Sequence, residues 1–431
     1  MRVLYSLLWW LALPLVLARL WLRGRREPGY RLHWGERLGF YGRKPAGAAP
    51  PTIWLHAVSV GETRAAEPLV DALLAAWPEA RIVLTHMTPT GRATGRDLFS
   101  KHGARLQQAY LPYDTACMVG RFLARFEPRI CILMETEVWP NLIDRCRKRG
   151  VPVALVNARL SQRSLGKARR FGRLLLDAAR GITLVAAQTE ADAARVRELG
   201  VARVVVTGSI KFDVLAPAAA LAAGARLRAR IGARPVLLCA STRDGEEALI
   251  LDAYQRAAAH LPAGLLLLIV PRHPQRFDAV GALLAARGLN LRRRSQLAQD
   301  GAALAPATQV LLGDSMGEMF AYYAACDAAF IGGSLLPLGG QNLIEASALG
   351  KPVLTGPHTF NFALVTQDAI AAGGAELVAD ADALMRQAAA LLDDAARLAA
   401  MGANALAFAS RHRGATARTL ALLQPLMAPP A

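Results

Sequence analysis

The sequence lacks the short motifs that mark several large enzyme classes. Its 431 residues contain no Walker A loop, no H-E-x-x-H helix and no set of cysteines and histidines at zinc-binding spacing. Kinase and metallohydrolase chemistry are therefore not supported. Cysteine is scarce as well: the five cysteines include no C-x-x-C pair, and most stand in apolar segments. They are predicted to be reduced core residues in a reducing compartment.

Acidic and aromatic residues are also in short supply. Aspartate and glutamate total 33 against 51 lysines and arginines, so the formal net charge is +18, and aromatic residues make up 6% of the chain. A charge of this sign implies an anionic partner, which can be nucleic acid, anionic lipid or a phosphorylated substrate. Basic stripes interleaved with aromatic residues for base stacking are missing outside residues 30–44, which argues against nucleic acid.

One long apolar run stands at the amino terminus, from Val3 to Leu22. About 20 helical residues are just enough to cross the hydrocarbon core of a bilayer. Residues 1–24 are therefore predicted to be a membrane anchor, and the arginines that follow should stay on the cytoplasmic side. A cleaved signal peptide is the alternative, but only Arg2 precedes the run and no clear A-x-A site ends it.

Residues 25–50 form a predicted basic juxtamembrane segment. Its part from Tyr30 to Lys44 mixes basic and aromatic side chains, as expected at the level of lipid headgroups. Trp9, Trp10 and Trp21 are expected near the lipid interfaces. A solvated basic linker remains the alternative interpretation of the segment.

The rest of the chain alternates short apolar runs with longer segments of helical period, which predicts α/β units with parallel sheets. The strands expected are Ile53–Val58, Arg81–Met87, Arg129–Met134, Val153–Asn157, Thr183–Gln188 and Val204–Thr207, then Val236–Ala240, Leu265–Val270, Val310–Leu312, Ala328–Ile331 and Val353–Leu354.

These strands predict two doubly wound domains, residues 51–213 and 235–405. An Ala/Gly/Arg-rich linker at 214–234 joins them, and a C-terminal helix at 406–431 could cross back to the first domain. Ligands of such sheets bind just beyond the carboxyl ends of the strands, where the two domains can form a shared cleft.

Acidic residues follow two of the predicted strands in the first half. Glu62, in Ser59-Val60-Gly61-Glu62, opens a helix and can be a general base, or simply a first-turn acid that complements the helix dipole. Glu135 and Glu137 end another strand, and Lys211 can supply a cation that makes two close carboxylates tolerable. Capping and a surface salt bridge remain the plain alternative for each segment.

Three loops in the second half also follow strands. Arg272, in Val270-Pro271-Arg272-His273-Pro274, offers a guanidinium fork to a phosphate or a pyrimidine edge. The segment Gly313–Met319 begins a helix, as anion sites do. The third loop joins Gly332-Gly333-Ser334 to Gly339–Glu345, where glycines let the backbone approach a ligand and Glu345 can accept from ribose hydroxyls.

Two further matches carry less weight. Gly313–Gly317 fits G-x-S-x-G, which would make Ser315 an esterase nucleophile with His358 or His412 as base, but this leaves the first domain without a role. Asp380-Ala381-Asp382 resembles a metal-binding D-x-D, yet it precedes a helix late in the chain, and Asp382 is interpreted as an N-cap.

The whole chain resembles the bacterial 3-deoxy-D-manno-octulosonic acid (Kdo) transferases, which add Kdo to the lipid A precursor. The segments that carry the resemblance, in order, are His56–Glu62, Thr88–Gly91, Leu111–Asp114, Met134–Leu142, Asn157–Ser161, Lys211–Asp213 and Gly356–Phe362.

The resemblance implies a GT-B fold, in which the first Rossmann-like domain receives the lipid acceptor and the second binds the CMP-sugar. It implies that Glu62 is the catalytic base and that Glu135 and Lys211 assist the transition state. The residues implied to hold the nucleotide are Pro271, Arg272, Ser315, Met316, Gly317, Glu318, Asn342, Leu343, Ile344 and Glu345.

The expected reaction is a single displacement with inversion, from CMP-Kdo to the lipid A precursor, in lipopolysaccharide synthesis. A leaving group with one phosphate can be balanced by Arg272 and helix N-termini, so no metal and no separate cofactor are expected. The expected location is the cytoplasmic face of the inner membrane, with anionic lipids as partners and no nucleic acid. A UDP-sugar transferase or GT-B-like epimerase is the enzymatic alternative, and a basic membrane-surface or nucleic-acid binding protein is the non-enzymatic one.

Overall fold

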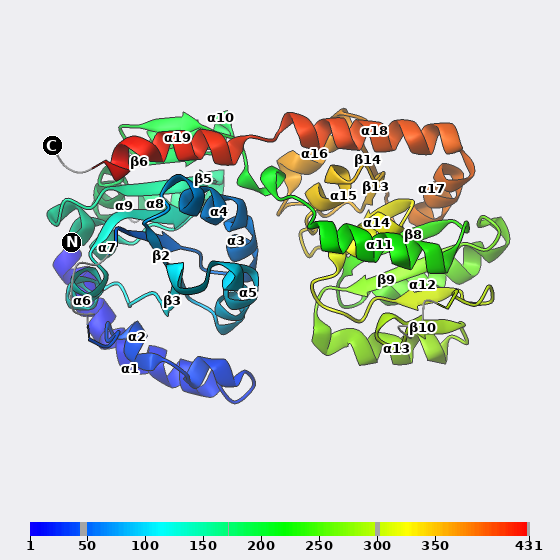
Figure 1. The fold of residues 1–431 in the computed structure, drawn as a ribbon, viewed down its shortest axis with the longest axis horizontal. Coiled ribbons are helices and arrows are strands. Elements are labelled where there is room, and N and C mark those ends of the chain that lie inside the picture. The colour runs from blue at the N-terminus through cyan, green and yellow to red at the C-terminus, as the bar shows by residue number, and fades with distance from the viewer. Residues whose placement is uncertain (44–49, 171, 298–301, 429–431) are drawn as a thin grey trace. The chain divides into compact units, whose positions relative to one another are not determined.

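The chain forms two α/β units in a computed structural model that describes residues 1–43, 50–170, 172–297 and 302–428, apart from the side chains of residues 167 and 169. Unit 1 comprises Met1–Val214 and Arg413–Ala431, and unit 2 comprises Leu215–His412. Each unit is built around one parallel sheet (Figure 1). The predicted α/β class with two doubly wound sheets is thus confirmed.

Unit 1 contains a sheet of order β3-β2-β1-β4-β5-β6-β7 within the described residues. Its strands are β1 (Thr52–His56), β2 (Arg81–His86), β3 (Leu106–Tyr110), β4 (Pro128–Met134), β5 (Val153–Ala158), β6 (Leu184–Ala187) and β7 (Val204–Val206). Its helices are α1 (Arg2–Arg23), α2 (Trp34–Arg37), α3 (Val60–Ala65), α4 (Glu67–Ala76), α5 (Pro89–Phe99), α6 (Ala116–Phe126), α7 (Pro140–Lys148), α8 (Gln162–Arg170), α9 (Arg173–Arg180), α10 (Glu190–Arg197) and α19 (Ala415–Met427).

Both faces of this sheet are buried, which explains the continuous apolar runs. Along β1, Ile53 and Leu55 pack into one hydrophobic cluster, and Trp54 between them packs into the cluster on the other face. Because side chains alternate along a strand, each apolar run supplies both cores at once. Helix α19, drawn in red in Figure 1, belongs to the first cluster through Leu423 and Met427.

Asp213 fixes the start of α19. Its carboxylate accepts hydrogen bonds from the backbone N–H groups of Gly414 (2.6 Å) and Thr416 (2.5 Å). A carboxylate in this position satisfies N–H groups that a helix start leaves unpaired, and it complements the helix dipole. The Lys211-Phe212-Asp213 segment therefore ties the C-terminal helix to unit 1.

Unit 2 contains the second sheet, of order β10-β11-β9-β8-β12-β13-β14 in the described part of the chain. Its strands are β8 (Val236–Thr242), β9 (Leu266–Pro271), β10 (Leu291–Arg293), β11 (Val310–Leu312), β12 (Ala328–Ile331), β13 (Val353–Thr355) and β14 (Ala375–Leu377). Its helices are α11 (Ala218–Ile231), α12 (Glu246–Ala257), α13 (Phe277–Ala286), α14 (Met319–Ala325), α15 (Ile344–Ala348), α16 (Ala363–Ala371), α17 (Ala381–Asp393) and α18 (Ala395–Arg411).

The structure adds one helix and three strands to the sequence-based expectation. Most of the predicted linker 214–234 is helix α11, which packs closely on α14: a Cβ on Gly224 would lie 2.5 Å from the methyl group of Ala324. The strands β3, β10 and β14 were not expected. All three lie at sheet edges, where strands are short and less apolar.

The amino-terminal segments are packed more closely on unit 1 than expected. Helix α1 is long and apolar enough to cross a membrane, but Trp9 stacks on Tyr113 with ring centroids 5.5 Å apart instead of facing a lipid interface. Arg37 is 2% exposed and donates to the Met87 carbonyl, so it cannot reach lipid headgroups. Residues 44–49 of the predicted juxtamembrane segment, Lys44 included, lie outside the described residues.

Candidate active site

The candidate active site of unit 1 lies where its sheet order reverses. The chain runs outward from β1 through β2 to β3 and then returns to β4, which pairs with β1 on the other side. Glu62 follows β1, and Glu135 follows β4 directly. Ligands of open α/β sheets bind at such switch points, beyond the carboxyl ends of the strands.

Glu62 stands in the first turn of α3, where Ser59 is the N-cap. The Ser59 hydroxyl accepts from the Glu62 backbone N–H, and the Glu62 carboxylate accepts from the Val58 N–H at 2.6 Å. Burial raises the pKa of this carboxyl to about 7. The Val58 bond opposes the rise, the charges of Glu135 and Glu137 add to it, and Lys211 lowers it. Ser59 thus caps the helix, while Glu62 is a first-turn acid, as the plain alternative holds, and its carboxyl also has a pKa near neutral pH.

Glu135 and Lys211 form an ion pair beside Glu62. The Lys211 Nζ lies 2.7 Å from the Glu135 Oε1. Glu135 is 9% exposed and has a left-handed backbone, with φ of 56°. Such a conformation is costly for a residue other than glycine and is found preferentially at functional sites.

Asn157 holds this ion pair in place. It is the next-to-last residue of β5, is fully buried and also has a left-handed backbone, with φ of 53°. Its side chain donates to Glu135 at 3.4 Å and accepts from the Ile210 backbone N–H at 3.1 Å. In the sequence, Asn157 stands out only as the first residue of the segment Asn157–Ser161. A buried polar residue at a strand end was the signal that could have identified it.

Glu137 is a third carboxylate at this edge. It accepts from the Trp139 indole N–H at 2.7 Å. Burial raises its pKa, the Trp139 bond lowers it, and the charge of Glu135 raises it further. The His56 Nε2 lies 3.9 Å away, but burial lowers the pKa of His56 to about 3, so this imidazole is neutral and the contact is not an ion pair at neutral pH.

The chemistry of this cluster follows from its charges. Three carboxylates share the site with the ammonium group of Lys211, and one of them, Glu62, exchanges a proton near pH 7. A carboxylate of that pKa is suited to take a proton from a hydroxyl at physiological pH. The arrangement can therefore support general-base catalysis.

Unit 2 carries its candidate residues at the equivalent edge. Pro271 ends β9, and the next residue, Arg272, donates to the Gln341 side chain at 3.3 Å. Burial lowers the pKa of His273, and the nearby positive charges of Arg272, Arg243 and Arg276 lower it further. This concentration of positive charge suits a phosphate group.

The glycine loop after β12 was expected to bring its backbone close to a ligand, but part of that backbone binds a side chain of the protein instead. The backbone N–H groups of Gly333, Ser334 and Leu335 donate to the fully buried carboxylate of Glu246, at 2.6, 2.9 and 3.0 Å. These groups are already satisfied and are not available to a ligand. Glu246 follows β8, and sequence reasoning missed it although other strand-end acids were considered.

We expect Glu246→Ala to destabilise unit 2 strongly, because three buried backbone donors would lose their acceptor. Each unsatisfied buried donor costs about 1–3 kcal/mol, so the free energy of unfolding should fall by about 3 kcal/mol or more. Urea unfolding, with hydrogen exchange of the peptide that contains Gly333, measures the effect. The control is Glu376→Ala, which removes a partly exposed pair with Arg397 and should cost less than about 1 kcal/mol. Equal effects of the two variants would contradict this role.

The loop after β11 is internally bonded. Ser315 donates to Glu318 and bonds to the Tyr322 hydroxyl, and Arg294 donates to Glu318 at 2.8 Å. Met316 is 55% exposed, and Gly317 has φ of 80°. Ser315 therefore has no hydrogen-bonded histidine base among the described residues, which excludes the esterase interpretation.

The loop before α15 is ordered by Asn342. Its side chain accepts from the Ile344 N–H at 3.1 Å and donates to Glu345 at 3.2 Å. Leu343 and Ile344 are buried, at 1% and 2% exposure, so only their backbone could meet a nucleotide. Asn342 and Glu345 carry the polar atoms of this loop.

In the D-x-D segment, the N-cap is not Asp382, as the sequence suggested. The N-cap of α17 is Asp380, which accepts from the Ala383 N–H at 2.7 Å, and Asp382 pairs instead with Arg256 at 2.7 Å. Across the described residues, no group of three or more histidine, cysteine or acidic side chains could hold a metal ion. The five cysteines are free, and Cys117 is exposed.

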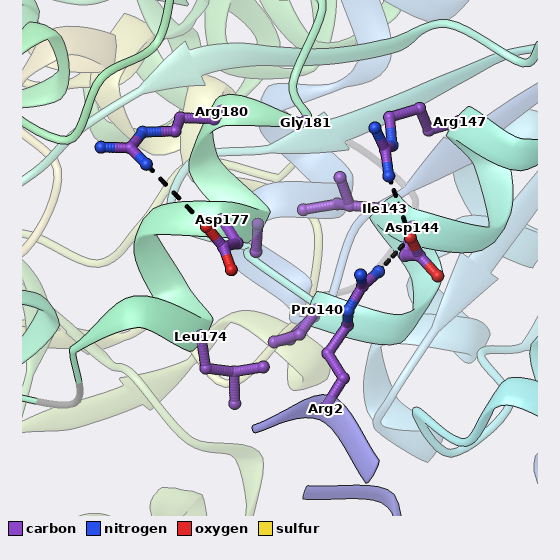
Figure 2. A pocket seen from close by; sticks show the side chains of 10 residues that line it. Arg2, Pro140, Ile143, Asp144, Arg147, Leu174, Asp177, Arg180 and Gly181 are labelled. Atoms are coloured by element: carbon purple, nitrogen blue, oxygen red, sulfur yellow. Dashed lines mark hydrogen bonds and ion pairs between the residues drawn. The ribbon is translucent and has the colours of Figure 1, made fainter.

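A cavity of about 230 Å³ lies elsewhere in unit 1, among the start of α1, α7 and α9 (Figure 2). Its carboxylates are paired: Arg2 and Arg147 meet Asp144, and Arg180 meets Asp177. Its lining includes none of Glu62, Glu135 and Lys211. The cavity is therefore separate from the candidate active site.

Comparison with known proteins decides the family. A family model described as 3-Deoxy-D-manno-octulosonic-acid transferase (kdotransferase) matches residues 32–214. A 3-deoxy-D-manno-octulosonic acid transferase of Bordetella pertussis is 49% identical over 95% of this chain and 96% of its own. The chain belongs to the Kdo transferase family. A Haemophilus influenzae protein of the same name is 38% identical over 99% of both chains, so this Kdo transferase is similar to these two relatives over nearly its whole length.

Solved structures agree on the fold of this Kdo transferase. A UDP-GlcNAc 2-epimerase of Neisseria meningitidis has a TM-score of 0.58 at 15% identity, and the match covers 87% of this chain and all of that one. A glycosyltransferase of Rickettsia africae has the same TM-score at 12% identity, covering 89% of this chain and all of that one. These structures show the fold alone, which is GT-B. The family makes the chain a glycosyltransferase, and its amino-terminal helix is a candidate membrane anchor.

Proposed function

We propose that this enzyme transfers Kdo from CMP-Kdo to a hydroxyl group of the lipid A precursor, with inversion at the anomeric carbon. The observation that carries the proposal is the partly buried Glu62 carboxyl, which has a pKa near 7 and stands beside the Glu135–Lys211 pair in a chain of this family. Such a carboxylate suits a general base that activates the acceptor hydroxyl.

In the proposed mechanism, Glu62 removes the hydroxyl proton as the oxygen attacks the anomeric carbon opposite the phosphate. The bond between the sugar and CMP breaks in the same step, so no covalent intermediate with the enzyme is formed. Lys211, held by Glu135 and Asn157, supplies positive charge close to the reacting groups. Its charge also keeps a share of Glu62 deprotonated at neutral pH.

The proposed donor site uses the strand-end loops of unit 2. Arg272 pairs with the CMP phosphate, the backbone of Pro271 meets the base, and Glu345 accepts from the ribose hydroxyls. The predicted contacts from Ser315, Met316, Gly317 and Glu318, and those from Asn342, Leu343 and Ile344, are part of this proposal. The single phosphate of the leaving group and the positive charge around His273 support transfer without a metal ion.

The acceptor and the location complete the proposal. The lipid A precursor is acylated and phosphorylated, so an enzyme acting on it has to work at a membrane surface. The apolar helix α1 and the net charge of +18 support a position on the cytoplasmic face of the inner membrane, against anionic lipids.

Binding of the free nucleotide tests the donor. At a concentration 100 times its Kd, CMP should stabilise the protein by about 2.7 kcal/mol, raising the melting temperature, whereas UDP should not. Addition of EDTA should leave this protection unchanged. The Arg272→Ala variant should lose the protection by CMP, while Arg256→Ala, which removes a surface pair in the same unit, should keep it. Protection by UDP but not CMP would favour the UDP-sugar alternative and contradict the proposal.

A further inference from the structure

Helix α1 makes polar contacts with unit 1 along its first two turns. Arg2 pairs with Asp144, as Figure 2 shows. Tyr5 donates to Asp114 at 3.0 Å, and the Ser6 hydroxyl accepts from Asn141 at 3.0 Å. The polar side chains at the start of this apolar helix therefore point toward the protein.

Asp114 is a fixed partner for this contact. It is 1% exposed and accepts from the backbone N–H groups of Asn141 and Leu142, at 3.0 and 2.8 Å. Burial raises its pKa to about 6, although these two bonds and the Tyr5 bond oppose the rise. If Tyr5 moved away, the buried Asp114 carboxylate would lose one of its hydrogen-bond donors, and such a loss costs free energy.

The contact continues through the apolar part of the helix. Trp9, Leu13, Val16, Leu17 and Leu20 pack on a cluster that includes Tyr113 and Met118. With Arg2, Tyr5 and Ser6, the inward residues recur every three or four positions over the length of α1. This is the periodicity of a helix that lies lengthwise on a surface.

The outward face of α1 is apolar, which is the reverse of an ordinary surface helix. Its exposed large side chains are Val3, Leu4, Leu7, Leu8, Trp10, Leu11, Leu15, Trp21 and Leu22, each between 46% and 75% exposed. A continuous exposed apolar face of this size marks an interaction with another apolar phase.

Cations stand at the carboxyl-terminal end of this face. Arg19, Arg23, Arg25 and Arg26 are exposed, and the guanidinium groups of Arg25 and Arg31 lie over the Trp21 ring, 4.8 and 4.9 Å from its centre. An apolar face with tryptophan and arginine at its edge fits the headgroup level of an anionic lipid leaflet.

We propose that α1 does not cross the bilayer but lies in the plane of the cytoplasmic leaflet, with one face docked on unit 1 and the other in anionic lipid. The proposal rests on the membrane location given above. A crossing helix needs all of its roughly 20 apolar residues inside the hydrocarbon. It would therefore give up the contacts from Arg2 to Leu20 and leave Asp114 without Tyr5. The docked helix keeps these contacts and still buries its apolar face.

Disulfide formation in native membranes tests the docked position. In a Cys117→Ser background, Ser6→Cys with Asn141→Cys should cross-link under mild oxidation, because the two native side chains are in hydrogen-bond contact. The matched control pair, Leu8→Cys with Asn141→Cys, places the first thiol on the outward face and should not cross-link. The linked peptide is detected by mass spectrometry. Absence of the first cross-link in membranes would overturn the proposal, whether or not it forms after detergent extraction.

Two further measurements test the other two arrangements, a helix that crosses the bilayer and a helix whose outward face is covered by a second copy of the chain. A thiol at Leu4→Cys should resist a membrane-impermeant maleimide in intact spheroplasts and react after permeabilisation. Reaction in intact spheroplasts would show a crossing helix. Leu8→Cys alone should not form a disulfide between two copies of the chain, and a predominant dimeric product would show that a second copy covers the face instead of lipid.

An assay of Kdo transfer with the same membranes distinguishes a failure of this proposal from a failure of the proposed function. The cross-linked Ser6→Cys, Asn141→Cys enzyme should retain Kdo transfer within about twofold of the reduced enzyme, because docking is its working state. If even the unmodified enzyme transfers no Kdo, the proposed function fails, and the cross-linking result still decides the position of α1. Cross-linking that abolishes transfer would contradict docking as the active arrangement.

Discussion

Replacement of Glu62 by glutamine is expected to lower kcat for Kdo transfer by roughly a hundredfold or more. Loss of a general base costs about 10²–10⁴-fold. The amide can still accept from the Val58 N–H, and Ser59 remains the N-cap of α3, so the fold should be kept. Steady-state assays with CMP-Kdo and the lipid acceptor measure the effect, and KM for CMP-Kdo should change little.

The pH profile makes this prediction specific. A base must be deprotonated to work, so activity of the native enzyme should rise with pH through a pKa near 7 and fall off below it. This limb should disappear in Glu62→Gln. The control is Glu67→Gln, which removes an exposed partner of Lys101 and should stay within about twofold of native activity. Near-normal turnover of Glu62→Gln would exclude the role of Glu62 as base.

Replacement of Lys211 by methionine is expected to lower kcat by at least about tenfold and to move the acid limb to higher pH. Burial raises the pKa of Glu62, and Lys211 lowers it, so removing the ammonium group raises it further and leaves less of the base in its active form. The buried Glu135 carboxylate also loses its 2.7 Å partner. Rates measured between pH 6 and pH 9 separate the raised pKa of Glu62 from the loss of the Glu135–Lys211 pair. Only the activity lost through protonation of Glu62 is recovered at high pH.

A double-mutant cycle shows whether Lys211 and Glu135 act as one unit. Because the two side chains are in contact, Lys211→Met with Glu135→Gln should cost less than the sum of the single effects. The control is Lys101→Met, which breaks exposed pairs with Glu67 and Asp71 and should leave both rate and profile unchanged. An unmoved acid limb in Lys211→Met would contradict the electrostatic coupling.

The apolar strands of both sheets could be predicted from the sequence because each is buried on two faces. Ile53, Trp54 and Leu55 are all fully buried, so the run is unbroken. The edge strands β3, β10 and β14 escaped prediction for the opposite reason. Residues 106–110 and 291–293 read Leu-Gln-Gln-Ala-Tyr and Leu-Arg-Arg, with no run that a pattern could detect. Their pairing depends on neighbours distant in sequence.

Long-range contacts also limited the prediction of helices. The composition of residues 214–234 suggested an Ala/Gly/Arg-rich linker, whereas residues 218–231 form helix α11, in which Gly224 packs closely on α14. Likewise, α1 resembles a membrane span by its length and apolar composition, and its contact with Asp114 could not be foreseen because the two partners are 109 residues apart. A local pattern does not show what such segments contact.

The candidate site could be predicted where functional residues follow the carboxyl ends of buried strands. Acidic residues after buried strands identified Glu62 and Glu135, Lys211 was expected as the cation that offsets them, and the structure brings these three together. Supporting residues such as Asn157 and Glu246 were missed because their role lies in hydrogen bonds to backbone groups far along the chain. The position of Asp380 as N-cap in place of Asp382 shows that a motif of two acids does not reveal which one caps the helix.

Mass spectrometry of the acceptor tests the central claim most directly. Purified enzyme with CMP-Kdo and the lipid A precursor should yield CMP and an acceptor heavier by whole Kdo units, without added metal. The same mixture with Glu62→Gln should leave the acceptor almost unchanged over the same time. An acceptor that stays unmodified by the native enzyme, or that is modified only when a UDP-sugar is supplied, would contradict the account.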